Sequence, residues 1–261
     1  MNNENTIFQT HDLAVGYRNG KQQITLLEGL NLSLEKGKLV ALLGQNGAGK
    51  STLLRALTGD EKPMAGTIVA DGRDLGEVSQ KDRSRLIALV STERIQAGAL
   101  TVKELVGLGR QPHTGFLGRL DDEDREIVRQ SMVDSGIIGK ADEYIASLSD
   151  GERQKAMIAR ALAQQTPIII LDEPTAFLDV ASRIETMRLL QTLAHDRGKA
   201  VLLSSHDISQ SLMLADELWL ITTDRQVLTG DTDTLVKAGA MNRLFENRDI
   251  HFNDQILDYS F

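Results

Sequence analysis

A glycine-rich motif between an apolar run and a helical pattern constrains the fold of this 261-residue chain more than any other feature. Residues 44–51 read Gly-Gln-Asn-Gly-Ala-Gly-Lys-Ser, which matches G-x-x-x-x-G-K-[ST] in full. The run 39–43 has the length and composition of a buried strand, and 50–58 carries leucines on one helical face. A strand, a glycine loop and a helix in this order predict an α/β fold that binds a nucleoside triphosphate.

The residue types of this loop explain how it would bind phosphate. Glycines let successive backbone N–H groups point into one hollow, and the helix that follows adds its dipole. Lys50 supplies a positive charge for the β- and γ-phosphates, and the Ser51 hydroxyl can bind Mg²⁺. The nucleotide-binding residues expected here are Gly44, Gln45, Asn46, Gly47, Ala48, Gly49, Lys50, Ser51 and Thr52.

Aliphatic runs alternate with helical patterns along most of the chain. Runs at 86–90, 168–171, 200–203 and 218–221 are almost continuously apolar, as in strands of a parallel sheet buried on both faces. The helical stripe at 180–194 lies between two of them, which predicts βαβ units. The other expected elements are shorter β segments in the first ~35 residues and at 67–71, helices within 97–155 and a helix over 233–245.

Two acids end the apolar run 168–171. The carboxyl ends of parallel strands are where α/β folds place ligands, so Asp172 and Glu173 are expected at the phosphate site. Successive side chains point in different directions, which allows Asp172 to bind Mg²⁺ and Glu173 to act as general base. His206 follows another strand and could contact the γ-phosphate. A lone histidine is more often structural, so both roles stay open.

Composition excludes several classes of protein. The net charge of −8 leaves no basic footprint, so no nucleic-acid partner is expected. Without cysteine, the chain cannot form disulfides or zinc–thiolate sites. We expect no signal peptide and no membrane span, because the first residues are polar and no stretch of 18 apolar residues occurs. Any membrane role would then depend on a partner.

Taken in order, the motifs resemble those of the nucleotide-binding subunit of ATP-binding cassette (ABC) transporters, over roughly residues 6–230. Residues 44–51 match the family's Walker A motif and 168–173 its Walker B motif. Leu-Ser-Asp-Gly-Glu at 148–152 resembles the signature, usually written L-S-G-G-Q. Three single residues match further family positions: Asp179 at the end of the D-loop, His206 as the switch histidine, and Tyr17 as the aromatic that stacks on adenine.

This resemblance implies a fold and a mechanism. The fold would be a P-loop core with a parallel sheet, an N-terminal antiparallel β subdomain and a helical subdomain inserted at about 97–155. Residues 1–230 would form a single domain, followed by a tail at 231–261. Two copies of the chain would meet head to tail around two molecules of ATP with Mg²⁺, so that Ser149 and Gly151 touch the γ-phosphate in trans. Without the resemblance, Ser149 is simply a helix N-cap.

Two departures from the family pattern bear on activity. Thr92 takes the position of the usual glutamine near Mg²⁺, although the Glu93 carboxylate could also reach Mg²⁺ or water, and Gln96 lies further along. In the signature, Asp150 and Glu152 replace Gly and Gln. An added carboxylate beside ATP would repel phosphate unless it points away, so we expect Asp150 to face outward. These changes raise the prospect of a weak ATPase.

Residues 105–119, with Gly-Arg-Gln-Pro-His at 109–113, are similar to the ATPases of importers for iron–siderophore, haem and cobalamin chelates. That similarity implies membrane permease partners, an indirect link to a substrate-binding protein, and a peripheral place at the cytoplasmic face of the inner membrane. The helical insertion would offer a groove to a permease helix, with His113 at the surface rather than as a metal ligand. The alternatives are a soluble cassette ATPase in cofactor assembly and a weakly hydrolysing regulatory module.

Overall fold

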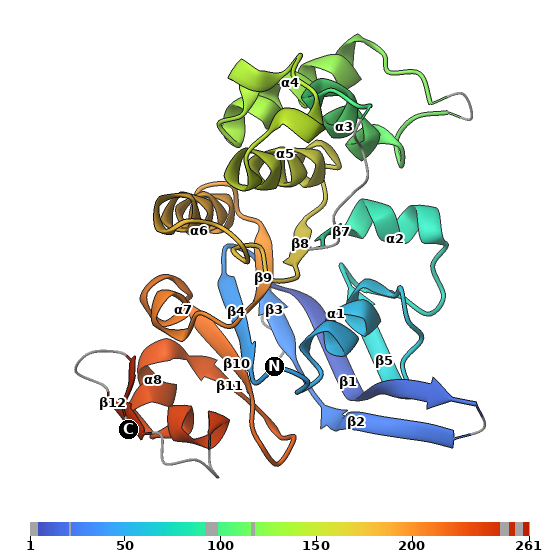
Figure 1. Ribbon diagram of the computed structural model, residues 1–261. Helices are drawn as coiled ribbons and strands as arrows, with labels where there is room; N and C mark the ends of the chain where they lie inside the picture. Colours follow the sequence, from blue (N-terminus) through green and yellow to red (C-terminus); the bar gives the residue numbers. More distant parts are fainter. Residues whose placement is uncertain are drawn as a thin grey trace.

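Five parallel strands and one antiparallel edge strand form the central sheet, in the order β11-β10-β4-β9-β8-β7 (Figure 1). Our computed structural model describes residues 5–20, 22–91, 99–115, 118–245, 251–253 and 258–260. The strands of this sheet are β4 (Leu39–Gly44), β7 (Ile87–Val90), β8 (Ile168–Leu171), β9 (Ala200–Ser205), β10 (Glu217–Ile221) and β11 (Val227–Asp231).

Strand β4 shows why these segments read as continuous aliphatic runs. Leu39, Ala41 and Leu43 point into one apolar cluster, and Val40 and Leu42 point into another. Both faces of the sheet are therefore buried, so alternating side chains must all be apolar. The predicted parallel sheet is confirmed.

Three strands between residues 6 and 35, together with a hairpin, form a second, antiparallel sheet in the order β2-β1-β5-β6, with β3 paired to β1. Asp71 and Gly72, both at positive φ, make the tight turn between β5 and β6. Helix α1 (Lys50–Thr58), at the bounds expected from the sequence, packs against both β1 and β4. The strands of this sheet are β1 (Thr6–Asn19), β2 (Gln22–Leu30), β3 (Ser33–Glu35), β5 (Ala65–Ala70) and β6 (Arg73–Asp74).

Between β7 and β8 the chain forms a helical layer, seen at the top of Figure 1. Its helices are α3 (Val102–Gly107), α4 (Asp122–Asp134) and α5 (Asp150–Ala163), with short turns η1 (Leu108–Arg110), η2 (Ile138–Lys140) and η3 (Ile145–Ser147). All three helices begin with a reciprocal capping box, in which the N-cap side chain and the third residue's acid satisfy each other's backbone amides. Local sequence thus determines where each helix starts.

The remaining elements pack mainly into the apolar cluster that also contains the helical layer. They are α2 (Gln80–Leu86), α6 (Val180–His195), α7 (Ile208–Leu214), α8 (Thr232–Lys237), η4 (Ala240–Leu244), β12 (His251–Asn253) and β13 (Asp258–Ser260). The structure divides the helix predicted over 233–245, because Gly239 takes a left-handed φ of 70° between α8 and η4. Within the described ranges, no helix is both long and apolar enough to span a membrane.

Candidate functional site

The glycine loop between β4 and α1 leaves backbone amides uncapped at the start of the helix. Gly47 and Gly49 have φ angles of 79° and 105°, a conformation that side chains disfavour. Gly49 is the N-cap of α1 and has no side chain to accept from the first amides. Asn46 and Ser51 lie exposed on either side of it. Such a helix N-terminus binds anions, phosphate among them.

Lys50 is the buried cation of this loop, with 6% of its surface exposed. Its Nζ donates to the carbonyl oxygens of Gly44 at 2.9 Å and Gln45 at 3.4 Å. Burial lowers the pKa of Lys50, and the carboxylates of Glu173 and Asp172 oppose that change. The ammonium group is thus held at the loop by carbonyls that a bound phosphate could replace.

One hydroxyl group bonds to both of the acidic residues that follow β8. Ser204 Oγ, from the neighbouring strand β9, donates to Asp172 Oδ1 at 2.6 Å and accepts from the Glu173 backbone N–H at 2.8 Å. Glu173 itself has a φ of 45°, so the chain turns sharply there. Asp172 therefore contacts Ser204, whereas the Glu173 carboxylate lies near Lys50. The sharp turn gives them these directions, rather than the alternation expected along a strand, because β8 ends before both acids. The motif search missed Ser204, whose only sequence signal is its place at the end of a buried strand.

Glu173 lies between the loop lysine and the histidine after β9. Its Oε1 is 4.0 Å from Lys50 Nζ, and its Oε2 is 3.7 Å from His206 Nδ1. The His206 side chain is 55% exposed, which leaves it accessible to a ligand. Three residues from three different elements thus converge on one point at the carboxyl edge of the sheet.

The signature segment lies at the N-terminus of α5, beside the N-terminus of α6. Ser149 caps α5, and a Cβ added at Gly151 would meet Ser182 Oγ at 2.6 Å. Asp179 caps α6 by accepting from Ser182 N–H and Oγ, both at 2.9 Å, which lower the pKa of Asp179. Asp150 is exposed, as expected. In the described part of the chain, no hydrogen bond or ion pair joins Ser149 or Gly151 to the phosphate loop.

Tyr17 and Thr92 are the remaining residues for which a ligand contact was predicted. Tyr17, on β1, is 48% exposed, and Thr92 lies outside the described residues. Gln45 Nε2, in the phosphate loop, donates a hydrogen bond to the carbonyl of Leu244, near the carboxyl end of the chain, at 2.5 Å. The sequence did not predict this contact. The phosphate loop, His206 and η4 together enclose a pocket of about 310 Å³.

The Gly-Arg-Gln-Pro-His segment at 109–113 joins the helical layer to the core. Arg110 is 5% exposed, and it donates to Asp124 Oδ1 at 2.7 Å and to the Ala163 carbonyl at 2.8 Å. Burial by itself would raise the pKa of Asp124. The hydrogen bonds from Arg110 and the Asp121 backbone, together with the charge of Arg110, outweigh burial, so the pKa lies below its usual value. His113 Nε2 lies 2.9 Å from the Gln164 carbonyl. The segment therefore has a structural basis in packing and ion pairing.

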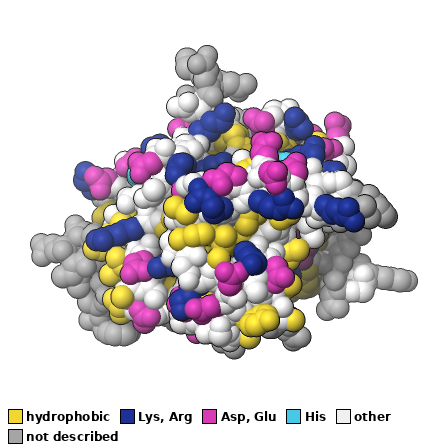
Figure 2. All heavy atoms as spheres, turned by 90° about the horizontal axis from the view of Figure 1, so that it is seen from above, with side chains coloured by type: hydrophobic (Ala, Val, Ile, Leu, Met, Phe, Trp, Pro, Cys, Tyr) yellow, Lys and Arg dark blue, Asp and Glu magenta, His cyan; other side chains and the backbone are white. Residues whose placement is uncertain are grey.

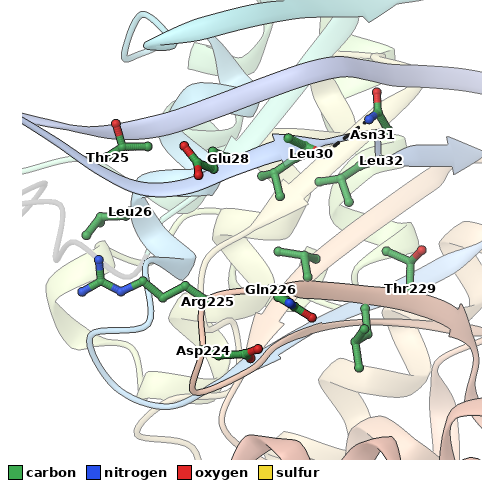
Figure 3. A pocket seen from close by; sticks show the side chains of 13 residues that line it. Thr25, Leu26, Glu28, Leu30, Asn31, Leu32, Asp224, Arg225, Gln226 and Thr229 are labelled. Carbon is green, nitrogen blue, oxygen red and sulfur yellow. Dashed lines mark hydrogen bonds between the residues drawn. The ribbon is translucent and has the colours of Figure 1, made fainter.

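A second pocket, of about 740 Å³, lies between the edge strands β2 and β11 (Figure 3). Thr25 and Glu28 reach it from β2, and Arg225 and Gln226 from the β10–β11 turn. None of the predicted phosphate-site residues lines it. Across the residues that the structure describes, no group of three or more His, Cys, Asp or Glu is placed to hold a metal ion.

A parallel sheet with a left-handed glycine loop, a buried loop lysine and two strand-end acids defines the class of P-loop nucleoside triphosphatase folds. Residues 27–176, more than half of the chain, match the family model of ABC transporters. The chain belongs to the ABC transporter family.

Individual relatives and structures agree with this assignment. The chain is 35% identical over 244 residues to the ferric enterobactin transport ATP-binding protein FepC of Escherichia coli K12, covering 94% of this chain and 89% of FepC. It is 38% identical over 202 residues to the iron(3+)-hydroxamate import ATP-binding protein FhuC of Bacillus subtilis 168, covering 77% of this chain and 74% of FhuC.

Two solved structures share the fold over most of their length. One is described as a metal-chelate type ABC transporter in an inward-facing conformation, with a TM-score of 0.81, 27% identity and 98% and 96% of the two chains covered. The other is the dimeric cassette MJ0796 with ADP and Pi bound, with a TM-score of 0.73, 26% identity and 87% and 99% covered.

Proposed function

We propose that this chain is the ATP-hydrolysing subunit of an importer for metal chelates of the iron–siderophore, haem or cobalamin class. The observation that carries the catalytic part is that Lys50 and His206 each lie within about 4 Å of the Glu173 carboxylate. The transport part rests on relatives such as FepC and FhuC, whose names specify ferric enterobactin transport and iron(3+)-hydroxamate import.

In this proposal the loop binds the triphosphate and the acids act on its end. Lys50 exchanges its bonds to the loop carbonyls for the β- and γ-phosphates. Glu173 accepts a proton from the attacking water, and His206 donates to the γ-phosphate and orients that water. Tyr17, exposed on β1, offers its ring to adenine, and Asp179 supports the neighbouring signature by capping α6.

The donor chemistry fits Mg²⁺. The Ser51 hydroxyl is exposed at the start of α1, and Asp172 presents a carboxylate at the end of β8, so the available donors are oxygen atoms, which Mg²⁺ prefers. These two residues would hold the ion, with Thr92 as a further candidate ligand. When bound, Mg²⁺ neutralises charge on the phosphates.

The signature would complete the site of a second copy. Ser149 and Gly151 make no bond to the phosphate loop of their own chain, yet they present a helix N-terminus, which favours phosphate. We infer that two copies pair head to tail, so that each signature contacts the ATP bound to the other copy's loop. The dimeric form of the related cassette MJ0796 supports this arrangement.

A permease would dock on the groove between α2 and the helical layer. This groove, of about 800 Å³, is lined by cations that include Arg83 and Arg160. The Arg160 guanidinium has no hydrogen bond or ion pair to another described residue, so an acidic side chain or the carboxyl end of a permease helix would suit it.

Seen from above, the helical side mixes apolar side chains with both signs of charge, as protein-binding surfaces do (Figure 2). Docking would hold the chain at the cytoplasmic face of the inner membrane. A substrate-binding protein would be linked to this chain only indirectly, through the permease.

One experiment tests this function. The tagged full chain is purified from detergent-solubilised membranes of its own organism, and the co-purifying proteins, bound metal chelate and MgATP turnover are measured. We expect a multi-span permease and ATP hydrolysis. Turnover without any membrane partner would favour the cofactor-assembly ATPase, and nucleotide binding with negligible turnover would favour the regulatory module.

A further inference from the structure

The signature segment contains two acids, and each of them is paired with a cation of the same chain. Asp150 Oδ1 lies 2.8 Å from Arg153 Nη1, one turn along α5. Glu152 Oε1 lies 3.5 Å from Lys140 Nζ, which comes from η2 and so from a different element. The second pair matters more, because Glu152 also bonds directly to Ser149.

Glu152 accepts the hydrogen bond that the Ser149 hydroxyl donates. Its Oε2 accepts from both Ser149 N–H and Ser149 Oγ, each at 2.9 Å. An ionised carboxylate can only accept hydrogen bonds, whereas an amide at this position could donate one to the serine oxygen. A phosphate oxygen also accepts, so Glu152 and an incoming phosphate compete for the single hydroxyl proton of Ser149.

The same geometry brings two negative charges together. A phosphate oxygen hydrogen-bonded to Ser149 Oγ would lie within about 6 Å of Glu152 Oε2, since each bond to the hydroxyl is roughly 3 Å. At an effective dielectric constant of about 20, repulsion between unit charges at this separation corresponds to roughly a hundredfold in affinity. A cation that neutralises Glu152 would remove much of this penalty.

Lys140 is placed to do so. It pairs with the carboxylate oxygen that Ser149 does not use, and its Nζ also lies 3.0 Å from Glu143 Oε1. Glu143 and then Glu152 raise the pKa of Lys140, while the Ser149 backbone and hydroxyl lower the pKa of Glu152. Both groups are thus charged at neutral pH.

We propose that Lys140 is a positioning residue of the trans nucleotide site: it neutralises Glu152, so that Ser149 can turn its hydroxyl proton from that carboxylate to the γ-phosphate. This inference rests on the proposed function, in which Ser149 meets the ATP of a second copy.

The test compares MgATP turnover in five full-length proteins: wild type, Lys140→Met, Glu152→Gln, and Lys140→Met combined with either Glu152→Gln or Glu143→Gln. Glutamine can still form the capping box, so Glu152→Gln removes charge without removing the cap. We expect Lys140→Met to raise KM for MgATP roughly tenfold, while kcat changes less than twofold. The rise in KM is smaller than the roughly hundredfold calculated for full repulsion because Lys140 is 38% exposed, and solvent already screens part of the charge. Adding Glu152→Gln should restore KM, and adding Glu143→Gln should not.

Three outcomes would overturn the proposal: an unchanged KM in Lys140→Met, restoration by Glu143→Gln but not by Glu152→Gln, or a loss of kcat together with a lower unfolding temperature. The variant Ser149→Arg distinguishes an incorrect role for Lys140 from an incorrect assignment of the trans site. If Ser149→Arg abolishes turnover while Lys140→Met leaves KM unchanged, the trans site is supported and the proposed role of Lys140 is refuted. If Ser149→Arg turns over normally, both the trans site and the role of Lys140 are refuted.

Discussion

Replacing Glu173 with glutamine tests the centre of the proposed site. The carboxylate lies 4.0 Å from Lys50 Nζ and 3.7 Å from His206 Nδ1, and glutamine keeps its shape while losing its ability to take a proton. We expect kcat to fall by about 10²–10⁴, which corresponds to roughly 3–5 kcal/mol of activation free energy.

The same substitution should leave ATP binding intact or strengthen it. Glu173 competes with an incoming γ-phosphate for the ammonium group of Lys50. At 4.0 Å and an effective dielectric constant of about 20, that attraction is at most about 4 kcal/mol, and solvent reduces it because Glu173 is 30% exposed. Removing the competing charge should therefore tighten ATP binding by up to about tenfold.

Phosphate release at saturating MgATP measures kcat, and titration calorimetry measures the affinity. Glu126→Gln is a matched control, because Glu126 forms an exposed pair with Arg129 on α4, away from the loop. Turnover of Glu173→Gln within tenfold of wild type would remove Glu173 as the general base. Markedly weaker ATP binding in this variant would refute the competition for Lys50.

Three other substitutions test separate parts of the structure. Lys50→Ala should weaken MgATP binding at least about tenfold by calorimetry, because a buried charge at the loop is lost; wild-type affinity would contradict the phosphate-loop assignment. Ser204→Ala removes the buried hydroxyl that bonds Asp172 and the Glu173 backbone, and it should lower kcat roughly tenfold and the free energy of unfolding in urea by about 1–3 kcal/mol; full activity would show that this bridge is dispensable. Arg110→Met leaves the buried Asp124 carboxylate unpaired and should lower the free energy of unfolding by about 3–5 kcal/mol in urea. Adding Asp124→Asn should recover part of that loss, and a cost below about 1 kcal/mol for Arg110→Met would mean that the pair is not desolvated.

Much of the fold could be predicted from local sequence. The bounds of α1 agree with the helix expected at 50–58, and Ser149 caps α5 as its sequence predicts. Buried strands are recognisable because both faces of the sheet are covered. The helix expected over 233–245 shows the limit, since the glycine at 239 breaks it while η4 packs into the core beyond it.

The residues of the candidate site could be predicted from the sequence, but the contacts between them could not. Asp172 and Glu173 stand out as acids at a strand end, yet the hydroxyl that bonds to both residues comes from Ser204, on a neighbouring strand. The contact between Gln45 and the Leu244 carbonyl joins residues 199 positions apart, and no local pattern predicts it.

The sequence by itself determined the order of strands and helices, the phosphate loop and the helix caps, because each depends on interactions among residues a few positions apart. Only the tertiary structure decided which charges meet: Glu173 with Lys50 and His206, and Glu152 with Lys140. Such pairings depend on the order of strands in the sheet and on the packing of separate elements. Neither can be inferred from local sequence patterns. The physical reason is that electrostatic interactions act through space over a few ångströms, whatever the distance along the chain.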